Sequence, residues 1–239
     1  MNSSDVVFLL DVDNTLLDND RIIADLRGHL EREFGAASSD RYWAIFEALR
    51  RELGYADYLG ALQRCRETIE RDGARGAEPR LLQMSGFLID YPFAERLYPR
   101  ALEVIEHLGA FGRTVILSDG DVVFQPRKVQ RSGLWDAVAG RVLIYVHKEQ
   151  MLADVQRLFP ANRYVMVDDK LRILAAMKAA WGSRLTTIFP RQGHYAHDPS
   201  ALAGYPKADL TIERIGELAD SQPPWPPPWP LVGAKSAFS

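Results

Sequence analysis

Five short runs of apolar residues, each followed by polar residues, constrain the fold of this chain more than any other feature of its sequence. The runs are residues 6–10, 114–117, 142–146, 164–167 and 185–189. Strands that are apolar on both faces are typical of parallel sheets covered by helices. Helical periodicity separates the later runs, over residues 100–112, 122–131, 149–158 and 171–181. This alternation predicts an α/β fold with a parallel sheet.

The interval between the first two runs breaks the alternation. From about residue 22 to residue 93 the sequence has only helical pattern, with breaks near residues 35–39, Gly54 and residues 73–79. Roughly seventy residues exceed what one crossover helix needs, so an inserted α-helical domain is predicted. We therefore expect a core of residues 1–19 and 94–220, an inserted helical domain of residues 20–93, and an extended Pro-rich tail of residues 221–239. A single larger α+β domain is the alternative.

Charge and cysteine content argue against several classes of protein. The 239 residues carry 29 basic and 32 acidic side chains, so the basic excess typical of nucleic-acid and membrane-surface proteins is missing. The single cysteine, Cys65, permits neither an internal disulfide nor a cysteine-based zinc cluster. No apolar run approaches the ~20 residues of a membrane span, and the first residues do not resemble a secretory signal. We expect a cytoplasmic monomer or homodimer that binds neither nucleic acid nor membrane.

Polar residues follow four of the five runs. They are Asp11, Asp13, Ser118, Lys148, Asp168 and Asp169. Because ligands of parallel α/β sheets bind beyond the carboxyl ends of the strands, we expect these side chains to converge on one crevice. Clustered carboxylates repel one another, and a hard divalent cation relieves that repulsion. Magnesium suits the site, since it prefers oxygen ligands from carboxylates, water and a substrate phosphate.

Each of these residues also has an ordinary structural interpretation. An Asp-x-Asp is often a surface turn, and an acidic pair before a helix commonly compensates the helix dipole. Ser118 by itself would be a helix N-cap, and Lys148 by itself a solvated side chain. A calcium loop is excluded, because it needs Gly and Glu where the chain has Leu16 and Ile22. The occurrence of all four groups in order at strand ends favours a functional site.

Several other residues receive structural interpretations. The arginines predicted to lie on a solvated helix face are Arg41, Arg50 and Arg51. The aromatic residues predicted to form the core of the helical stretch are Tyr42, Trp43, Tyr55 and Tyr58. His194 and His197 have no partner cluster in the sequence, so they are predicted to lie in a loop rather than at a metal.

Taken together, the strand-end residues resemble the motifs of the haloacid dehalogenase-like (HAD) superfamily. Asp11-Val12-Asp13-Asn14-Thr15-Leu16 resembles its first motif and Ile116-Leu117-Ser118 its second. Lys148 stands where the third-motif lysine falls, and Val165-Met166-Val167-Asp168-Asp169 is similar to the fourth motif. The resemblance implies a Rossmann-like parallel sheet with a helical cap of the C1 type inserted after the first strand.

The resemblance also implies a role for each residue. Asp11 would be the nucleophile that forms an aspartyl-phosphate, and Asp13 would protonate the leaving oxygen and then activate water. Ser118 and Lys148 would bind the transferred phosphoryl group. Magnesium would be held by the carboxylates of Asp11 and Asp168 and by the main-chain carbonyl of Asp13.

Three further residues are less well defined by the resemblance. Asp169 would bind the metal through water or orient Lys148. Asp119 stands where many relatives have Asn or a small neutral residue, and it would offer its main-chain N–H to the phosphate or contact a substrate hydroxyl. Lys128 is a rival for the role of Lys148, but it is predicted to lie in mid-helix, ten residues after Ser118.

The activity that the resemblance implies is a magnesium-dependent phosphohydrolase acting on a small phosphorylated metabolite. The acid at position 13 argues against the metal-free dehalogenase branch, which lacks an acid there. A phosphomutase and a haloacid dehalogenase-type hydrolase are alternatives on the same fold. Alternatives from other classes are a glycosyltransferase, whose Asp-x-Asp would hold a metal–nucleotide sugar, and a catalytically idle binding protein.

Overall fold

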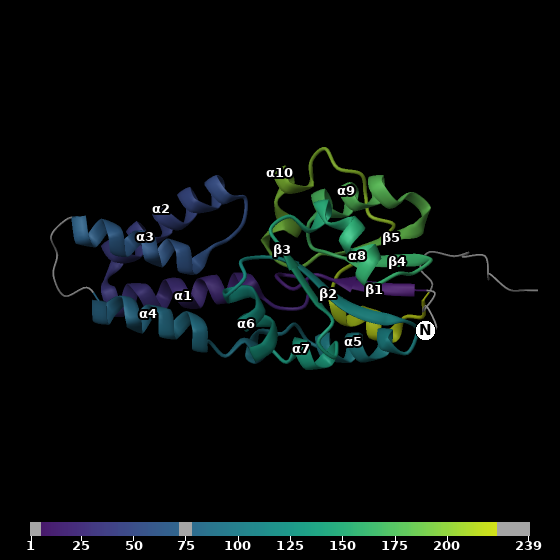
Figure 1. Cartoon of the computed structure of the whole chain (residues 1–239), viewed down its shortest axis with the longest axis horizontal. Helices are drawn as coiled ribbons and strands as arrows, with labels where there is room; N and C mark the ends of the chain where they lie inside the picture. Colours follow the sequence, from purple (N-terminus) through teal and green to yellow (C-terminus); the bar gives the residue numbers. More distant parts are fainter. Residues whose placement is uncertain (1–5, 72–77, 224–239) are drawn as a thin grey trace, which may run out of the picture.

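The computed structural model describes residues 6–71 and 78–223 (Figure 1). The tail from residue 224 onward and most of the predicted break at residues 73–79 lie outside this part of the chain. Within it, no helix is both long and apolar enough to cross a membrane.

Six parallel strands form one sheet in the order β3-β2-β1-β4-β5-β6. The strands are β1 (Val6–Leu10), β2 (Arg113–Asp119), β3 (Val142–Tyr145), β4 (Arg163–Val167), β5 (Leu185–Pro190) and β6 (Leu210–Ile212). The parallel α/β fold is therefore confirmed. The sequence did not indicate β6, because its three residues are too few to show a periodic pattern; this strand pairs with β5 from Ile188 and Leu210 onward.

Alternate residues of each central strand enter different cores. Val7 and Leu9 of β1 belong to the core under α8 (Leu152–Leu158) and α9 (Leu171–Trp181), while Phe8 and Leu10 belong to the core under α5 (Ala101–Gly109). All four are fully buried, as expected for a sheet that helices cover on both faces. In Figure 1 these helices lie on opposite sides of the strands.

The described residues of the core form six α-helices, four of them predicted: one matches its predicted range, two begin later and one ends earlier. They are α5 (Ala101–Gly109), α6 (Phe124–Arg131), α7 (Leu134–Ala137), α8 (Leu152–Leu158), α9 (Leu171–Trp181) and α10 (Pro199–Leu202). The short 3-10 segments are η1 (Phe93–Arg96), η2 (Lys148–Gln150), η3 (Gly182–Arg184), η4 (His194–His197) and η5 (Ile215–Asp220). Helix α6 begins two residues later than predicted, because the Asp121 carboxylate accepts hydrogen bonds from the main-chain N–H groups of Val123 and Phe124.

Five α-helices of the described residues lie between β1 and β2, and the four that precede η1 lie together to one side of the sheet in Figure 1. They are α1 (Asn19–Phe34), α2 (Ala36–Leu53), α3 (Tyr58–Arg71) and α4 (Glu78–Asp90), and we call them the helical insertion. The break predicted at residues 35–39 is a single residue, Gly35, with φ of 82°. Gly54 ends α2 in the left-handed conformation, with φ of 80°, which favours glycine.

Buried aromatic rings form the interior of the helical insertion. Tyr42, Trp43 and Phe46 of α2 pack against one another, and Phe46 contacts Tyr58 of α3. The Tyr42 hydroxyl donates to the main-chain oxygen of Tyr58 at 3.0 Å, so its buried polar group is paired. Tyr55, also predicted in this core, is only half-buried.

Two neighbouring connections join the insertion to the sheet. The main-chain N–H of Asp18 donates to the carbonyl of Arg96 at 2.7 Å, and the N–H of Tyr98 donates to the carbonyl of Leu16 at 2.9 Å. Entry and exit of the insertion are thus tied to each other directly beyond the carboxyl end of β1.

Candidate active site

The carboxyl ends of β1 to β4 bring together the side chains that the sequence predicted to converge. Asp11 directly follows β1, and its N–H donates to the carbonyl of Val167, which is the last residue of β4. Asp168 continues β4 by donating its N–H to the carbonyl of Ile188. The strand ladders therefore extend one residue past β1 and β4, which places the two carboxylates side by side.

Lys148, at the start of η2 after β3, lies between these carboxylates. Its Nζ is 2.5 Å from an oxygen of Asp11 and 2.6 Å from an oxygen of Asp168, and all three residues are buried. The carboxylates raise the pKa of Lys148, although its burial by itself would lower it. This lysine is a fixed positive charge within the acidic cluster.

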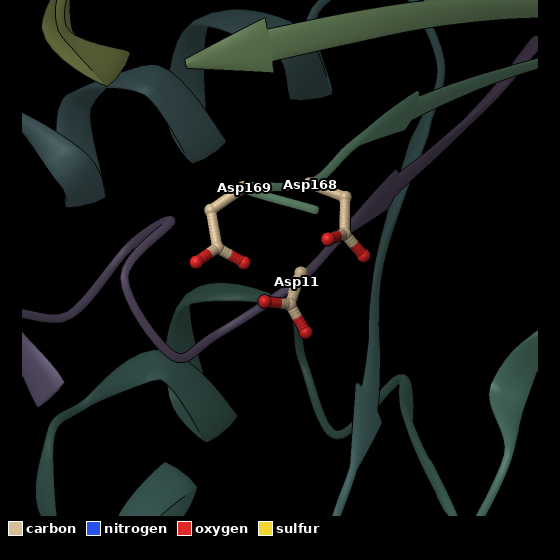
Figure 2. A group of neighbouring side chains, drawn as sticks. All are labelled: Asp11, Asp168 and Asp169. Carbon is tan, nitrogen blue, oxygen red and sulfur yellow. The ribbon is translucent and has the colours of Figure 1, made fainter. Parts of the chain in front are cut away.

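Three carboxylates, those of Asp11, Asp168 and Asp169, face one another in Figure 2. One oxygen from each lies within 4.8 Å of the others. Both oxygens of Asp169 are buried and have no hydrogen-bond partner among the described residues. Buried polar atoms are almost always paired, so two unpaired oxygens indicate a missing partner such as a cation.

The acidic cluster has more negative charge than its surroundings can balance. Burial, with the nearby charge of Asp11, raises the pKa of Asp168 to about 6 even though Lys148 opposes the shift. Burial also raises the pKa of Asp169 well above its usual value. A divalent cation would stabilise the ionised forms, and magnesium prefers hard oxygen ligands of this kind. The residues present therefore fit such an ion, with Asp11, Asp168 and Asp169 as its carboxylate ligands.

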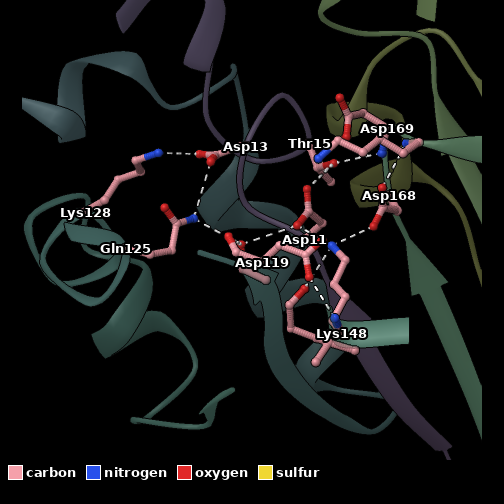
Figure 3. Close-up of polar contacts among 12 residues, drawn as sticks. Asp11, Asp13, Thr15, Asp119, Gln125, Lys128, Lys148, Asp168 and Asp169 are labelled. Carbon is pink, nitrogen blue, oxygen red and sulfur yellow. Dashed lines mark hydrogen bonds and ion pairs between the residues drawn. The ribbon is translucent and has the colours of Figure 1, made fainter. Parts of the chain in front are cut away.

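Two hydroxyl groups donate hydrogen bonds to the Asp11 carboxylate and hold its orientation. Thr15 donates to one Asp11 oxygen at 3.3 Å, and Ser118 donates to the other at 3.4 Å (Figure 3). The Thr15 hydroxyl also accepts from the N–H of Asp169 at 3.1 Å, which links the first and fourth strand ends. Thr15 was not predicted as a site residue, although it lies within the first motif.

Asp13 lies outside the acidic cluster, and a separate set of contacts holds its carboxylate. Lys128 Nζ is 2.7 Å from one of its oxygens, and Gln125 donates to the other at 3.4 Å (Figure 3). Gln125 also donates to Ser118 at 3.0 Å, and Lys128 also donates to Asn19 at 3.1 Å. These contacts connect Asp13 with the second motif and with the first residue of the insertion.

Lys128, which the sequence suggested only as a rival of Lys148, is fully buried and reaches the site through its contact with Asp13. Gln125 and Lys128 are three residues apart on α6, so both side chains lie on the same face of this helix. The polar pair at helical spacing, directly after the second-motif strand, was the available signal. Lys128 does not replace Lys148, which contacts a different carboxylate.

Asp119 ends β2, and one of its oxygens accepts the main-chain N–H of Lys148 at 2.8 Å. The carboxylate therefore fixes the turn that carries the buried lysine. Burial is the main cause that raises the pKa of Asp119. Asp119 also lines the pocket described next.

A pocket of about 460 Å³ opens beside these residues, between the sheet and the insertion. The sheet side contributes Asp13, Asp119, Asp169 and Lys170. The insertion contributes Asn19, Ile23, Arg27, Trp43, Arg50 and Tyr55, and the segment after β5 contributes His194, Tyr195 and Tyr205. Each wall thus comes from a different part of the chain.

Arg50 and His194, which were given structural interpretations from the sequence, both lie at this pocket. Arg50 is half-buried and contacts the Tyr195 hydroxyl, so its placement on a solvated face was wrong; Arg41 and Arg51 are exposed as predicted. His194 lies in η4, and its Nδ1 is 2.6 Å from an oxygen of Asp20. In the described part of the chain it does not belong to a metal-binding group.

Comparisons with known proteins agree with this geometry. A family model for haloacid dehalogenase-like hydrolases matches residues 6–180. A crystal structure from Burkholderia xenovorans LB400, described as a haloacid dehalogenase-like hydrolase, is 68% identical, with a TM-score of 0.84 over 90% of this chain and 95% of that chain. A comparison with curated protein sequences finds no significant match.

More distant structures share the fold. The HAD-hydrolase YfnB from Bacillus subtilis, bound to magnesium, is 16% identical, with a TM-score of 0.58 over 90% of this chain and 96% of that one. The L-2-haloacid dehalogenase from Xanthobacter autotrophicus, with chloropropionic acid covalently bound, is 18% identical, with a TM-score of 0.56 and the same coverage. Because the family model spans most of the chain and the Burkholderia protein matches over nearly its whole length, the chain belongs to the haloacid dehalogenase-like hydrolase family.

Proposed function

We propose that this hydrolase is a magnesium-dependent phosphatase that cleaves a small phosphorylated metabolite through an aspartyl-phosphate on Asp11. The observation that carries the proposal is the carboxylate of Asp169, buried without a partner beside Asp11 and Asp168. A cluster with this excess of negative charge suits a divalent cation. Bound magnesium would supply neutralising charge for a carboxylate that has to approach an anionic phosphate.

In this mechanism some side chains hold the nucleophile and Asp13 transfers protons. Lys148, Thr15 and Ser118 hold the Asp11 carboxylate, so one of its oxygens can attack phosphorus without first reorienting. The bond from phosphorus to the substrate oxygen breaks, and Asp13 gives that oxygen a proton. Asp13 then takes a proton from the water that attacks the phosphorus of the intermediate, which restores Asp11.

We further propose that the helical insertion acts as a cap over the site, the C1 arrangement implied by the sequence. Its residues form one wall of the pocket, and its two connections are paired with each other at the end of β1. Asn19 receives a hydrogen bond from Lys128, which also holds Asp13. Movement of the insertion would therefore be transmitted to the proposed acid.

Haloacid dehalogenation is the second candidate, because proteins with that activity share the fold. A carboxylate nucleophile could displace halide from carbon without a metal or a proton donor. That reaction would leave no use for the unpaired Asp169 or for Asp13 with its two partners from α6. These two features favour phosphate ester cleavage.

The purified chain should release phosphate from members of a panel of phosphorylated metabolites and no halide from 2-chloropropionate or 2-bromopropionate. Excess EDTA should suppress the release, and added magnesium should restore it. Phosphorus NMR of the products distinguishes hydrolysis from a phosphomutase, which would return the phosphoryl group to the substrate. Halide release that is insensitive to EDTA would overturn the phosphatase proposal in favour of the dehalogenase.

Magnesium should raise the thermal midpoint of unfolding more at pH 8 than at pH 5. The pKa of Asp168 is raised to about 6, so this carboxylate becomes protonated, and a poorer ligand, as the pH falls through that value. In the metal-free protein the folded state holds this proton more tightly than the unfolded state. The contribution of Asp168 to metal-free stability therefore falls as the pH rises from about 4 to about 6.

Differential scanning fluorimetry with and without magnesium at the two pH values measures this effect. Asp169→Asn should reduce the magnesium-induced shift at pH 8, whereas Asp136→Asn, at an exposed position on α7, should leave it unchanged. An equal shift at both pH values, or a full shift in Asp169→Asn, would contradict the assignment of the metal site.

A further inference from the structure

Arg27 of α1 reaches the pocket from the helical insertion, away from the proposed reaction centre. Its guanidinium carbon lies 4.8 Å from the centre of the Trp43 ring, and both residues line the pocket. The described part of the chain provides no acidic group within ion-pair distance of Arg27 and no hydrogen bond to it. The buried indole N–H of Trp43 is also without a partner there. This wall therefore presents donors that no protein acceptor satisfies.

Other cations at the pocket are already engaged by protein groups. Arg50 contacts the Tyr195 hydroxyl and lies 3.7 Å from Glu47. Arg172 pairs with Glu149 at 2.6 Å. Lys170 Nζ lies 5.3 Å from the centre of the Tyr195 ring, so this lysine also has a protein partner. Arg27 has no ion-pair partner among the described residues.

Arg27 lies further along α1 than Asn19, which is the residue of this helix next to the proposed acid. The spacing between the two positions is about the length of a small metabolite. Asn19, Ile23 and Arg27 are spaced four residues apart on one face of the helix, and all three line the pocket. Asn19 lies next to Lys128, which holds Asp13. Eight residues further along, at about 1.5 Å per residue, Arg27 is roughly 12 Å away along the helix axis. This spacing favours a group other than the phosphate at Asp11 as the partner of Arg27.

We infer that Arg27, stacked on Trp43, forms a subsite for a second anionic group of the substrate, either a carboxylate or a second phosphate. A guanidinium binds both groups through paired hydrogen bonds, and the indole face restricts its orientation. The inference rests on the proposed function, which identifies the phosphate ester as the group that reacts at Asp11. It narrows the substrate class to phosphate esters that carry another negative charge some three to six bonds from that phosphate.

The test uses substrates that differ only in the second group. One pair is 3-phosphoglycerate and glycerol 3-phosphate, which differ by a carboxylate, and the other is propane-1,3-diol bisphosphate and its monophosphate. Arg27→Ala should lower kcat/KM for the doubly anionic member roughly tenfold to a hundredfold more than for its partner, chiefly through KM. The pair that shows the difference identifies the second group. The matched control Arg21→Ala, at an exposed arginine of the same helix, should not change the ratio.

A binding measurement separates this inference from the proposed function. In the Asp11→Asn background, calorimetry should show that Arg27→Ala weakens binding of 3-phosphoglycerate or the bisphosphate more than binding of the singly anionic partner. This result can hold even if wild-type protein releases no phosphate, in which case the proposed function fails and the subsite remains. Equal effects on both members of each pair, in binding and in kcat/KM, would overturn the subsite.

Discussion

Asp11→Asn is expected to abolish phosphate release, with a loss in kcat on the order of 10⁴-fold or more, because it removes the nucleophile itself. The amide is nearly isosteric with the carboxylate, and Asp11 is buried, so the pocket should keep its shape. Steady-state assays with any substrate from the panel measure the loss. Retention of more than about one hundredth of the wild-type rate would contradict the assignment.

The fold should survive this change for an electrostatic reason. Asp11 is one of the charges that raise the pKa values of Asp168 and Asp169, so its neutralisation relieves repulsion in the cluster. Lys148 keeps Asp168 as a partner at 2.6 Å. The thermal midpoint of Asp11→Asn without magnesium should therefore be close to that of the wild type, which separates loss of chemistry from loss of structure.

Mass spectrometry offers a direct check on the intermediate. Wild-type protein mixed with substrate and quenched in acid should carry the mass of one phosphoryl group, and peptide mapping should place it on Asp11. Asp11→Asn treated in the same way should carry none. Phosphorylation of the variant at another residue would show that Asp11 is not the nucleophile.

The sequence predicted the parts of this site that depend on short-range pattern. Asp11, Ser118 and Asp168 stand at or next to the end of a buried strand, and Lys148 follows shortly after the half-buried β3. A parallel sheet brings such ends to one edge whatever the details of packing. The same reasoning missed β6, a short edge strand whose three residues carry no periodic signal. It also placed helix starts early where a side chain such as Asp121 sets the first turn.

The remaining site residues depend on contacts between distant segments, which one sequence does not reveal. Arg50 and Tyr195 are far apart in the chain and meet only because the insertion packs toward the segment after β5. In the sequence Lys128 is an ordinary helical lysine. Its part in the site is shown only by the 2.7 Å contact of its Nζ with Asp13. Arg27 is exposed, and only its place at the pocket distinguishes it from a solvated arginine.

Asp13→Asn should slow phosphate release by a factor on the order of 10²–10⁴, the usual contribution of a positioned acid or base. The Asp13 carboxylate lies outside the acidic cluster and is held by Lys128 and Gln125. The variant should therefore keep the magnesium-induced shift, whereas its own thermal midpoint should fall, because Lys128 stays buried without its carboxylate partner. A lost magnesium shift would mean that the Asp13 side chain belongs to the metal site instead.

The dependence on the leaving group makes this prediction specific to proton transfer. An alkyl alcohol leaves poorly unless its oxygen is protonated as the bond to phosphorus breaks, whereas 4-nitrophenolate needs little protonation. Single-turnover rates of Asp13→Asn should therefore fall much more for an alkyl phosphate than for 4-nitrophenyl phosphate. The later attack of water should be slowed to the same extent for both substrates, because the aryl and alkyl groups have already departed. If formation of the intermediate slows equally for the two substrates, Asp13 positions the site through Lys128 and Gln125 but does not donate the proton.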